Sequence, residues 1–101
     1  MYARITRAHY DPTQDEEMTR LVQEQLIPAY RRIPGFQRCM GGVDRTARQT
    51  FTLSIWETEE QATNVPSAPE AHALGDLVAH FQAAGGVFDV APEVYEVTVQ
   101  S

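Results

Sequence analysis

The clearest pattern in the chain is an alternation of side-chain types over its central segment. From Phe51 to Trp56 the residues read Phe-Thr-Leu-Ser-Ile-Trp, so three apolar side chains share one side of an extended chain. This period of two, with β-branched and aromatic residues, predicts a strand over residues 50–57. We expect the side that carries Phe51 to be buried, and the side that carries Ser54 and Trp56 to lie on an uncovered face of the sheet.

The same reasoning predicts three further strands and three helical segments, each bounded by turn or helix-breaking residues. The other strands are expected at residues 2–10, 36–43 and 94–99, and the helical segments at 14–32, 58–64 and 70–84. In the second strand, Phe36, Arg38 and Met40 are expected to share one face, and Gly41-Gly42 permits a bulge.

The first helix carries an apolar stripe with helical spacing, and its start has the form of a capping box. Thr13 is the expected cap, with Glu16 three residues later. Pro28 lacks the N–H that would bond to the carbonyl of Glu24, so it should bend the helix or begin its end. The stripe consists of Met18, Leu21, Val22, Leu26, Ala29 and Ile33.

The element order β-α-β-β-α-β is that of the ferredoxin-like plait, an α+β fold. It predicts a four-stranded antiparallel sheet with both main helices on one face, in a single domain over residues 1–101. Aromatic residues occur at both parities of the strands, so the helix-free face is also partly apolar and should be covered. We therefore expect a homodimer formed through the sheet face.

Composition narrows the class of partner. A formal net charge of −6, from 8 arginines and 14 acidic residues, argues against nucleic-acid binding. A single cysteine, Cys39, excludes an intrachain disulfide and fits a reducing compartment. No signal peptide or membrane-length apolar run is apparent, so we expect a cytoplasmic protein without membrane contact.

Three short motifs at the expected places resemble those of a known family. They are Ile33-Pro34-Gly35-Phe36 after the first helix, Ile55-Trp56-Glu57-Thr58-Glu59-Glu60 after the third strand, and the terminal Val94-Tyr95-Glu96-Val97. With the chain length and element order, they resemble the antibiotic biosynthesis monooxygenase (ABM) domain of the dimeric α+β-barrel superfamily. The resemblance implies a homodimer with a pocket between sheet and helices in each subunit. It also implies oxidation of polycyclic phenols by molecular oxygen without metal or flavin, an activity of several members.

The haem-degrading branch of that superfamily is disfavoured because its further residues are missing. The only asparagine is Asn64, so none lies in the first strand. The position of that branch's second tryptophan falls near Val65, and that of its histidine iron ligand near Gly75. A haem-binding protein is therefore the third hypothesis.

Two residues on one face of the first strand are the candidate catalytic groups. His9 can take a proton from a phenol near neutral pH, and Arg7 can stabilise the resulting anion. The alternative is that His9 is a solvated histidine near a strand end.

The candidate substrate-binding residues are Trp56, Phe36, Arg38 and His72. Trp56 could stack on an aromatic ligand, or it could simply pack in the core. His72 is followed at helical spacing by Asp76 and His80, which together could orient a base or form a solvated helix face. A complete metal site would need more ligands, so we expect no metal and no cofactor.

Two functions are favoured over the haem-binding hypothesis. The first is a cofactor-independent monooxygenase that oxidises a small aromatic phenol with O₂, with His9 or less favourably His72 as base and Arg7 or Arg38 stabilising the anion. The second is a non-catalytic dimeric module that binds a small apolar or aromatic molecule.

Overall fold

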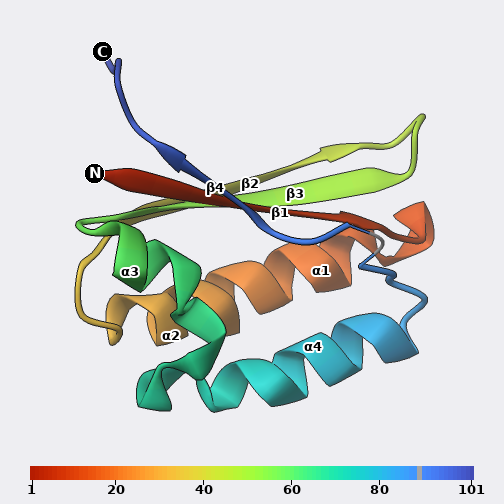
Figure 1. Cartoon of the computed structure of the whole chain (residues 1–101). Coiled ribbons are helices and arrows are strands. Elements are labelled where there is room, and N and C mark those ends of the chain that lie inside the picture. The colour runs from red at the N-terminus through yellow and green to blue at the C-terminus, as the bar shows by residue number, and fades with distance from the viewer. Residues whose placement is uncertain (89) are drawn as a thin grey trace.

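The four strands form one antiparallel sheet, and all helices lie on one face of it (Figure 1). The computed structural model describes residues 1–88 and 90–101, without the side chains of Glu70 and Ala73. The strands are β1 (Tyr2–His9), β2 (Phe36–Asp44), β3 (Gln49–Trp56) and β4 (Glu93–Glu96), in the order β2-β3-β1-β4. The helices are α1 (Asp15–Leu21), α2 (Ile27–Arg31), α3 (Glu59–Thr63) and α4 (Ala73–Ala83). The predicted ferredoxin-like α+β fold is confirmed, and the sheet of one chain is open, with β2 and β4 at its edges.

The two faces of β3 are the reverse of the prediction. Ser54 and Trp56 are 1% and 0% exposed and face the helices, whereas Phe51 is 37% exposed on the helix-free face. In β1, Arg4 is opposite Ser54 and therefore faces the helices, while Arg7 is opposite Phe51 and faces away from them. The expectation of an uncovered Trp56 was wrong because alternation separates two faces without stating which one the helices cover.

The first long helix changes its hydrogen-bond pattern before Pro28. Between α1 and α2 lies a π-helical turn over Val22–Leu26, and the N–H of Ile27 donates to the carbonyl of Val22. Since Pro28 has no N–H to give to Glu24, the wider turn carries the helix across the proline. The chain therefore stays helical to Arg31.

The predicted capping box at Thr13 does not form. A 3₁₀ turn over Pro12–Gln14 comes first, and the Asp11 carboxylate accepts the N–H of Thr13 at 3.0 Å. A complete capping box is found instead at the start of α3. There Thr58 Oγ1 accepts the N–H of Gln61, and the Gln61 side chain accepts the N–H of Thr58.

Two of the motifs named above meet in space. Gly35 has a φ of +89°, and its carbonyl accepts the N–H of Glu57 at 2.9 Å. A Cβ atom at Gly35 would lie 1.9 Å from the side-chain oxygen of Gln61. Glycine is therefore required at this turn for both its backbone angle and its lack of a side chain.

The bulge in β2 lies at its start and not at Gly41-Gly42. The register shifts between Phe36 and Arg38, so Phe36 is opposite Trp56 while Arg38 is opposite Ile55. Phe36 and Arg38 consequently face opposite sides of the sheet, contrary to the prediction that they share a face.

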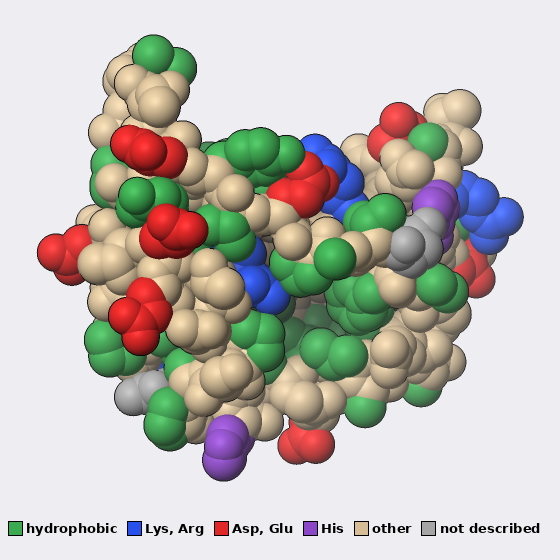
Figure 2. Space-filling view, in the orientation of Figure 1, with side chains coloured by type: hydrophobic (Ala, Val, Ile, Leu, Met, Phe, Trp, Pro, Cys, Tyr) green, Lys and Arg blue, Asp and Glu red, His purple; other side chains and the backbone are tan. Residues whose placement is uncertain are grey.

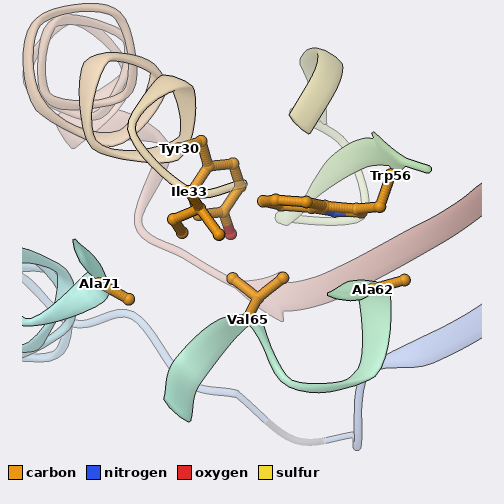
Figure 3. Packing of buried hydrophobic residues seen from close by; sticks show 6 residues of the cluster. All are labelled: Tyr30, Ile33, Trp56, Ala62, Val65 and Ala71. Atoms are coloured by element: carbon orange, nitrogen blue, oxygen red, sulfur yellow. The ribbon is translucent and has the colours of Figure 1, made fainter. Parts of the chain in front are cut away.

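The well-packed core is concentrated at one end of the sheet–helix interface (Figure 3). Trp56 lies edge-on to Tyr30 and Phe36, with ring centroids 5.6 and 5.5 Å away. Ala62 and Val65, from α3 and the turn after it, close this cluster from the other side. Away from this cluster several apolar helix residues are only half-buried: Met18, Val22 and Phe81.

The chain leaves the sheet after a short last strand. β4 ends at Glu96, and the last sheet-like contact is the Val97 N–H donating to the Met1 carbonyl at 2.9 Å. The remaining residues project away from the helices, with Val99 86% exposed (Figure 1).

Candidate functional site

A concavity of about 490 Å³ lies on the helix-free face of the sheet. Its walls are mostly apolar and come from three strands and the segment that precedes β4: Ile5, Val43, Phe51, Leu53 and Val90. His9 and Arg7 also line it, so the two predicted catalytic side chains share one apolar concavity. Gly42 makes room for Phe51 here, since a Cβ atom at that glycine would lie 2.5 Å from the Phe51 ring.

The charge of Arg7 is compensated within the chain. Its Nη1 donates to the Glu93 carboxylate, and the Tyr95 hydroxyl donates to the other oxygen of the same carboxylate. The hydrogen bond to Glu93 raises the pKa of Tyr95, because ionised tyrosine could no longer donate. A phenolate in the concavity would therefore share Arg7 with Glu93.

His9 is held by both its main chain and its ring. Its N–H and carbonyl pair with those of Val87 at 2.9 Å, which ties the end of β1 to the segment after α4. Its Nε2 lies 3.3 Å from Nε2 of Gln49 on the adjacent strand. Since the Gln49 amide nitrogen can only donate, this contact favours the tautomer whose Nε2 is an acceptor, and a substrate that gave its proton to Nε2 would have to displace the Gln49 N–H.

Trp56 lies on the opposite face from His9, inside the core cluster (Figure 3), and the partly buried Phe36 packs against that cluster. The Trp56 indole N–H donates to Ser54 Oγ at 2.8 Å, which satisfies its polar atom without a ligand. The structure therefore supports the packing interpretation of Trp56.

The remaining two predicted residues lie elsewhere. Arg38 is exposed on the helix-free face and does not line the concavity. His72 is exposed before α4, and His80 further along that helix lies 3.2 Å from the Glu17 carboxylate. The six predicted site residues thus fall into separate places: His9 and Arg7 share the concavity, Trp56 and Phe36 share the core cluster, and Arg38 and His72 lie apart from both.

Sequence reasoning missed Arg4. Its side chain points to the helices and the residue is 8% exposed, and Nη1 donates to the carbonyls of Ala62 and Thr63, at 3.1 and 3.3 Å. Burial lowers the pKa of Arg4, and nearby Tyr30 opposes that shift. Alternation along β1 puts Arg4 and Arg7 on different faces of the sheet. This pattern in the sequence could have shown that only one of the two arginines faces the helices.

The helix-facing side also contains open space. Figure 2 shows a hollow between the sheet and the helices, with mostly hydrophobic side chains around it and arginine atoms at its margin. Arg4 is the one arginine that the strands direct toward the helices, because Arg7 and Arg38 are on the other face.

Over residues 1–88 and 90–101, no group of three or more His, Cys, Asp or Glu side chains could hold a metal ion. No helix in this part of the chain combines the length and apolar character needed to cross a membrane.

The fold is shared with solved oxygenase structures. One is a monooxygenase from the gene ActVA-Orf6 of Streptomyces coelicolor, solved with Nanaomycin D, at TM-score 0.66 and 17% identity over 99% of this chain and 88% of that chain. Another is SnoaB, a cofactor-independent oxygenase from Streptomyces nogalater, at TM-score 0.66 and 15% identity over 98% and 94% of the two chains. A third is an antibiotic biosynthesis monooxygenase, at TM-score 0.63 and 15% identity over 100% of both chains.

No family model matches the chain, and no curated protein matches it. The resemblance to the ABM domain is therefore confirmed at the level of the fold, over nearly the whole chain.

Proposed function

We propose that the chain is an oxygenase of the ABM type that oxidises a small aromatic phenol with O₂, without metal or flavin. The observation that carries this proposal is the concavity in which His9 and Arg7 meet apolar walls from β1 and β3. A flat aromatic substrate needs such walls, and its oxidation needs a base at the edge. The shared fold with oxygenases supports the same class of reaction.

The reaction begins with proton transfer from the phenol to His9. The resulting phenolate is rich in electrons at the ring carbon conjugated with it, and that carbon reacts with O₂. In an anthrone-like substrate a CH₂ group becomes C=O, with one oxygen atom kept in the product and the other released as water. Arg7 stabilises the phenolate while Glu93 limits how strongly it does so.

A second copy of the chain completes this site in the proposal. Four strands of about six residues, at about 3.3 Å per residue and about 4.8 Å between strands, present a face on the order of 400 Å². Protruding side chains and the projecting C-terminal residues around Val99 would raise the buried area per subunit toward about 800 Å², the size of a stable interface. Met40 and Tyr95, 43% and 51% exposed, lie on that face. The homodimer would exclude water from the concavity, which strengthens the electrostatic contribution of Arg7.

The test is oxygen uptake by the full chain with anthrone and with naphthols, each under air and under nitrogen. We expect uptake above the buffer rate with at least one of these compounds, and kcat at least about 100-fold lower in His9→Gln. His80→Gln is the matched control, since His80 is exposed on α4 and contacts Glu17 outside the concavity. Buffer-rate uptake with every compound, or an unchanged His9→Gln enzyme, would contradict the proposal.

A non-catalytic binding module is the second candidate, and the Arg7–Glu93 pair is the observation that favours it. If the phenolate cannot displace Glu93, the concavity binds the neutral phenol and the reaction does not start. Saturable binding of a naphthol without oxygen uptake would distinguish this candidate from the oxygenase.

A further inference from the structure

Glu93 is held through both of its carboxylate oxygens. One oxygen accepts from Arg7 Nη1, and the other accepts from the Tyr95 hydroxyl. The side chain of Glu93 is 33% exposed, compared with 53% for Arg7. An isolated ion pair with this exposure contributes little, but a carboxylate with two donors is displaced only when both bonds break. The Tyr95 hydroxyl therefore makes Glu93 a firmer partner of Arg7 than the ion pair alone would.

The register of the sheet places this group of side chains at the concavity. Glu93 is opposite Ile5 and Tyr95 is opposite Ala3, so both lie on the helix-free face with Arg7. Ile5 and Arg7 line the concavity, and Glu93 is the next residue across the sheet, on the edge strand β4. The carboxylate of Glu93 therefore influences a ligand in the concavity through Arg7.

The charges around the concavity favour an uncharged ligand. Arg7 is compensated by Glu93, and Asp44 supplies a further carboxylate among the lining residues. One oxygen of Asp44 accepts the N–H groups of Thr46 and Ala47, at 3.1 and 3.0 Å, which holds this carboxylate at the end of β2. An anionic ligand would therefore meet two carboxylates and a cation that is already paired. Like charges placed side by side in a site cost affinity.

An aromatic acid could pair with Arg7 only by displacing Glu93. The displaced carboxylate would lose both of its donors and would remain close to the carboxylate of the ligand. A charged group left without its partner is an effective way for a site to reject the wrong ligand. A neutral phenol requires no such displacement, because its hydroxyl can approach His9 while Arg7 and Glu93 stay paired.

We propose that Glu93 determines the specificity of this site and restricts it to aromatic phenols that carry no acidic group. Glu93 acts through Arg7, as a positioning residue that keeps the guanidinium paired. The inference rests on the proposed function for the place of the ligand, and it adds the charge of the substrate. Removing the Glu93 charge releases Arg7 and lets the same concavity take an aromatic carboxylate.

Two phenols that differ only in charge test the inference. The probes are 6-hydroxy-2-naphthoate and its amide, 6-hydroxy-2-naphthamide, with affinities from calorimetry on the full chain at pH 7, where the carboxylic acid is ionised. We expect the wild type to bind the amide about tenfold or more tightly than the acid. Glu93→Gln should strengthen binding of the acid about tenfold and change binding of the amide by less than about threefold.

Three further variants separate pairing at Arg7 from the general effect of charge. Asp44→Asn removes the same charge from the concavity and leaves Arg7 paired, so it should change the preference much less than Glu93→Gln does. In the double variant Arg7→Gln/Glu93→Gln, the gain in acid binding should disappear. Tyr95→Phe keeps the Glu93 charge but removes one of its two bonds, so the preference should fall partway. This variant tests the inference if Glu93→Gln fails to fold by circular dichroism.

The outcomes distinguish this inference from the proposed function. Equal binding of acid and amide by the wild type, or equal effects of Glu93→Gln and Asp44→Asn, would overturn the inference and leave oxygen uptake with neutral phenols unchanged. A preference for the amide in a chain that shows no oxygen uptake would support the selection by charge and contradict only the oxidation. Failure of both compounds to bind would contradict both proposals.

Discussion

Arg4 and Arg7 are the same residue type on the same strand, yet the two faces of β1 give them opposite surroundings. Arg7 is half exposed and bound to a carboxylate, while Arg4 is buried against carbonyls and an aromatic cluster. The two faces of the sheet therefore differ in how they surround a positive charge and in how tightly their side chains pack. The helix-free face presents a histidine and a compensated cation in an open concavity, and the helix-facing side holds a cation that has no carboxylate partner among the described residues, near a packed core.

The largest expected effect comes from the core of the helix-facing side. Trp56→Ala should lower the free energy of unfolding by about 3–5 kcal/mol, because it empties a fully buried site and leaves Ser54 without its donor. Phe51→Ala, on the other face, should lose less than half as much. Urea unfolding at concentrations where the chain is monomeric measures both, and equal losses would mean that the two faces are not packed differently.

The ionisation of Tyr30 gives a second test of how tightly the helix-facing side of the sheet is packed. Burial raises the pKa of Tyr30 to about 12, so the folded chain holds its neutral form above pH 10. The stabilisation is fully present below the unfolded-state pKa near 10 and is lost as pH rises from there to about 12. It should amount to about 2–3 kcal/mol.

Unfolding free energies between pH 9 and 12 test this, with Tyr30→Phe as the control. The variant should lose less stability over that interval than the wild type. Identical pH profiles for the two proteins would contradict the buried position of Tyr30.

A smaller effect is expected at Cys39, which also faces the helices. Burial raises the pKa of the Cys39 thiol to about 11 from an ordinary value near 9. At pH 8 the reactive thiolate should therefore be about 100-fold scarcer than in the unfolded chain. Iodoacetamide labelling with and without urea measures the ratio, and labelling of the folded chain at the unfolded rate would place Cys39 on an accessible surface.

Much of the fold could be predicted because its signals are local. Period-two alternation and the breaker sequence at Pro34-Gly35 predicted the element order, and the structure confirms it. The face assignment failed because both sides of β3 carry apolar residues, so burial depended on tertiary packing that alternation does not encode. The capping box appeared at Thr58 and not at Thr13 because Asp11 and Pro12 begin a 3₁₀ turn first.

The candidate site was only partly predictable for the same reason. His9 and Arg7 were grouped correctly because residues two apart on a strand share a face. A bulge at the start of β2 puts Phe36 and Arg38 on opposite faces of the sheet, whereas the sequence had suggested a bulge at Gly41-Gly42. Arg4 was overlooked because its burial comes from α3, a segment 58 residues further along the chain.

The central claim is that the helix-free face carries the proposed site and is covered by a second copy of the chain in a homodimer. Sedimentation equilibrium at micromolar concentration tests it directly, on the wild type and on Phe51→Asp, which puts a charge beside the concavity. The account predicts a dimer mass for the wild type and a folded monomer for the variant. A monomer mass for the wild type with the circular dichroism of the folded chain would contradict it.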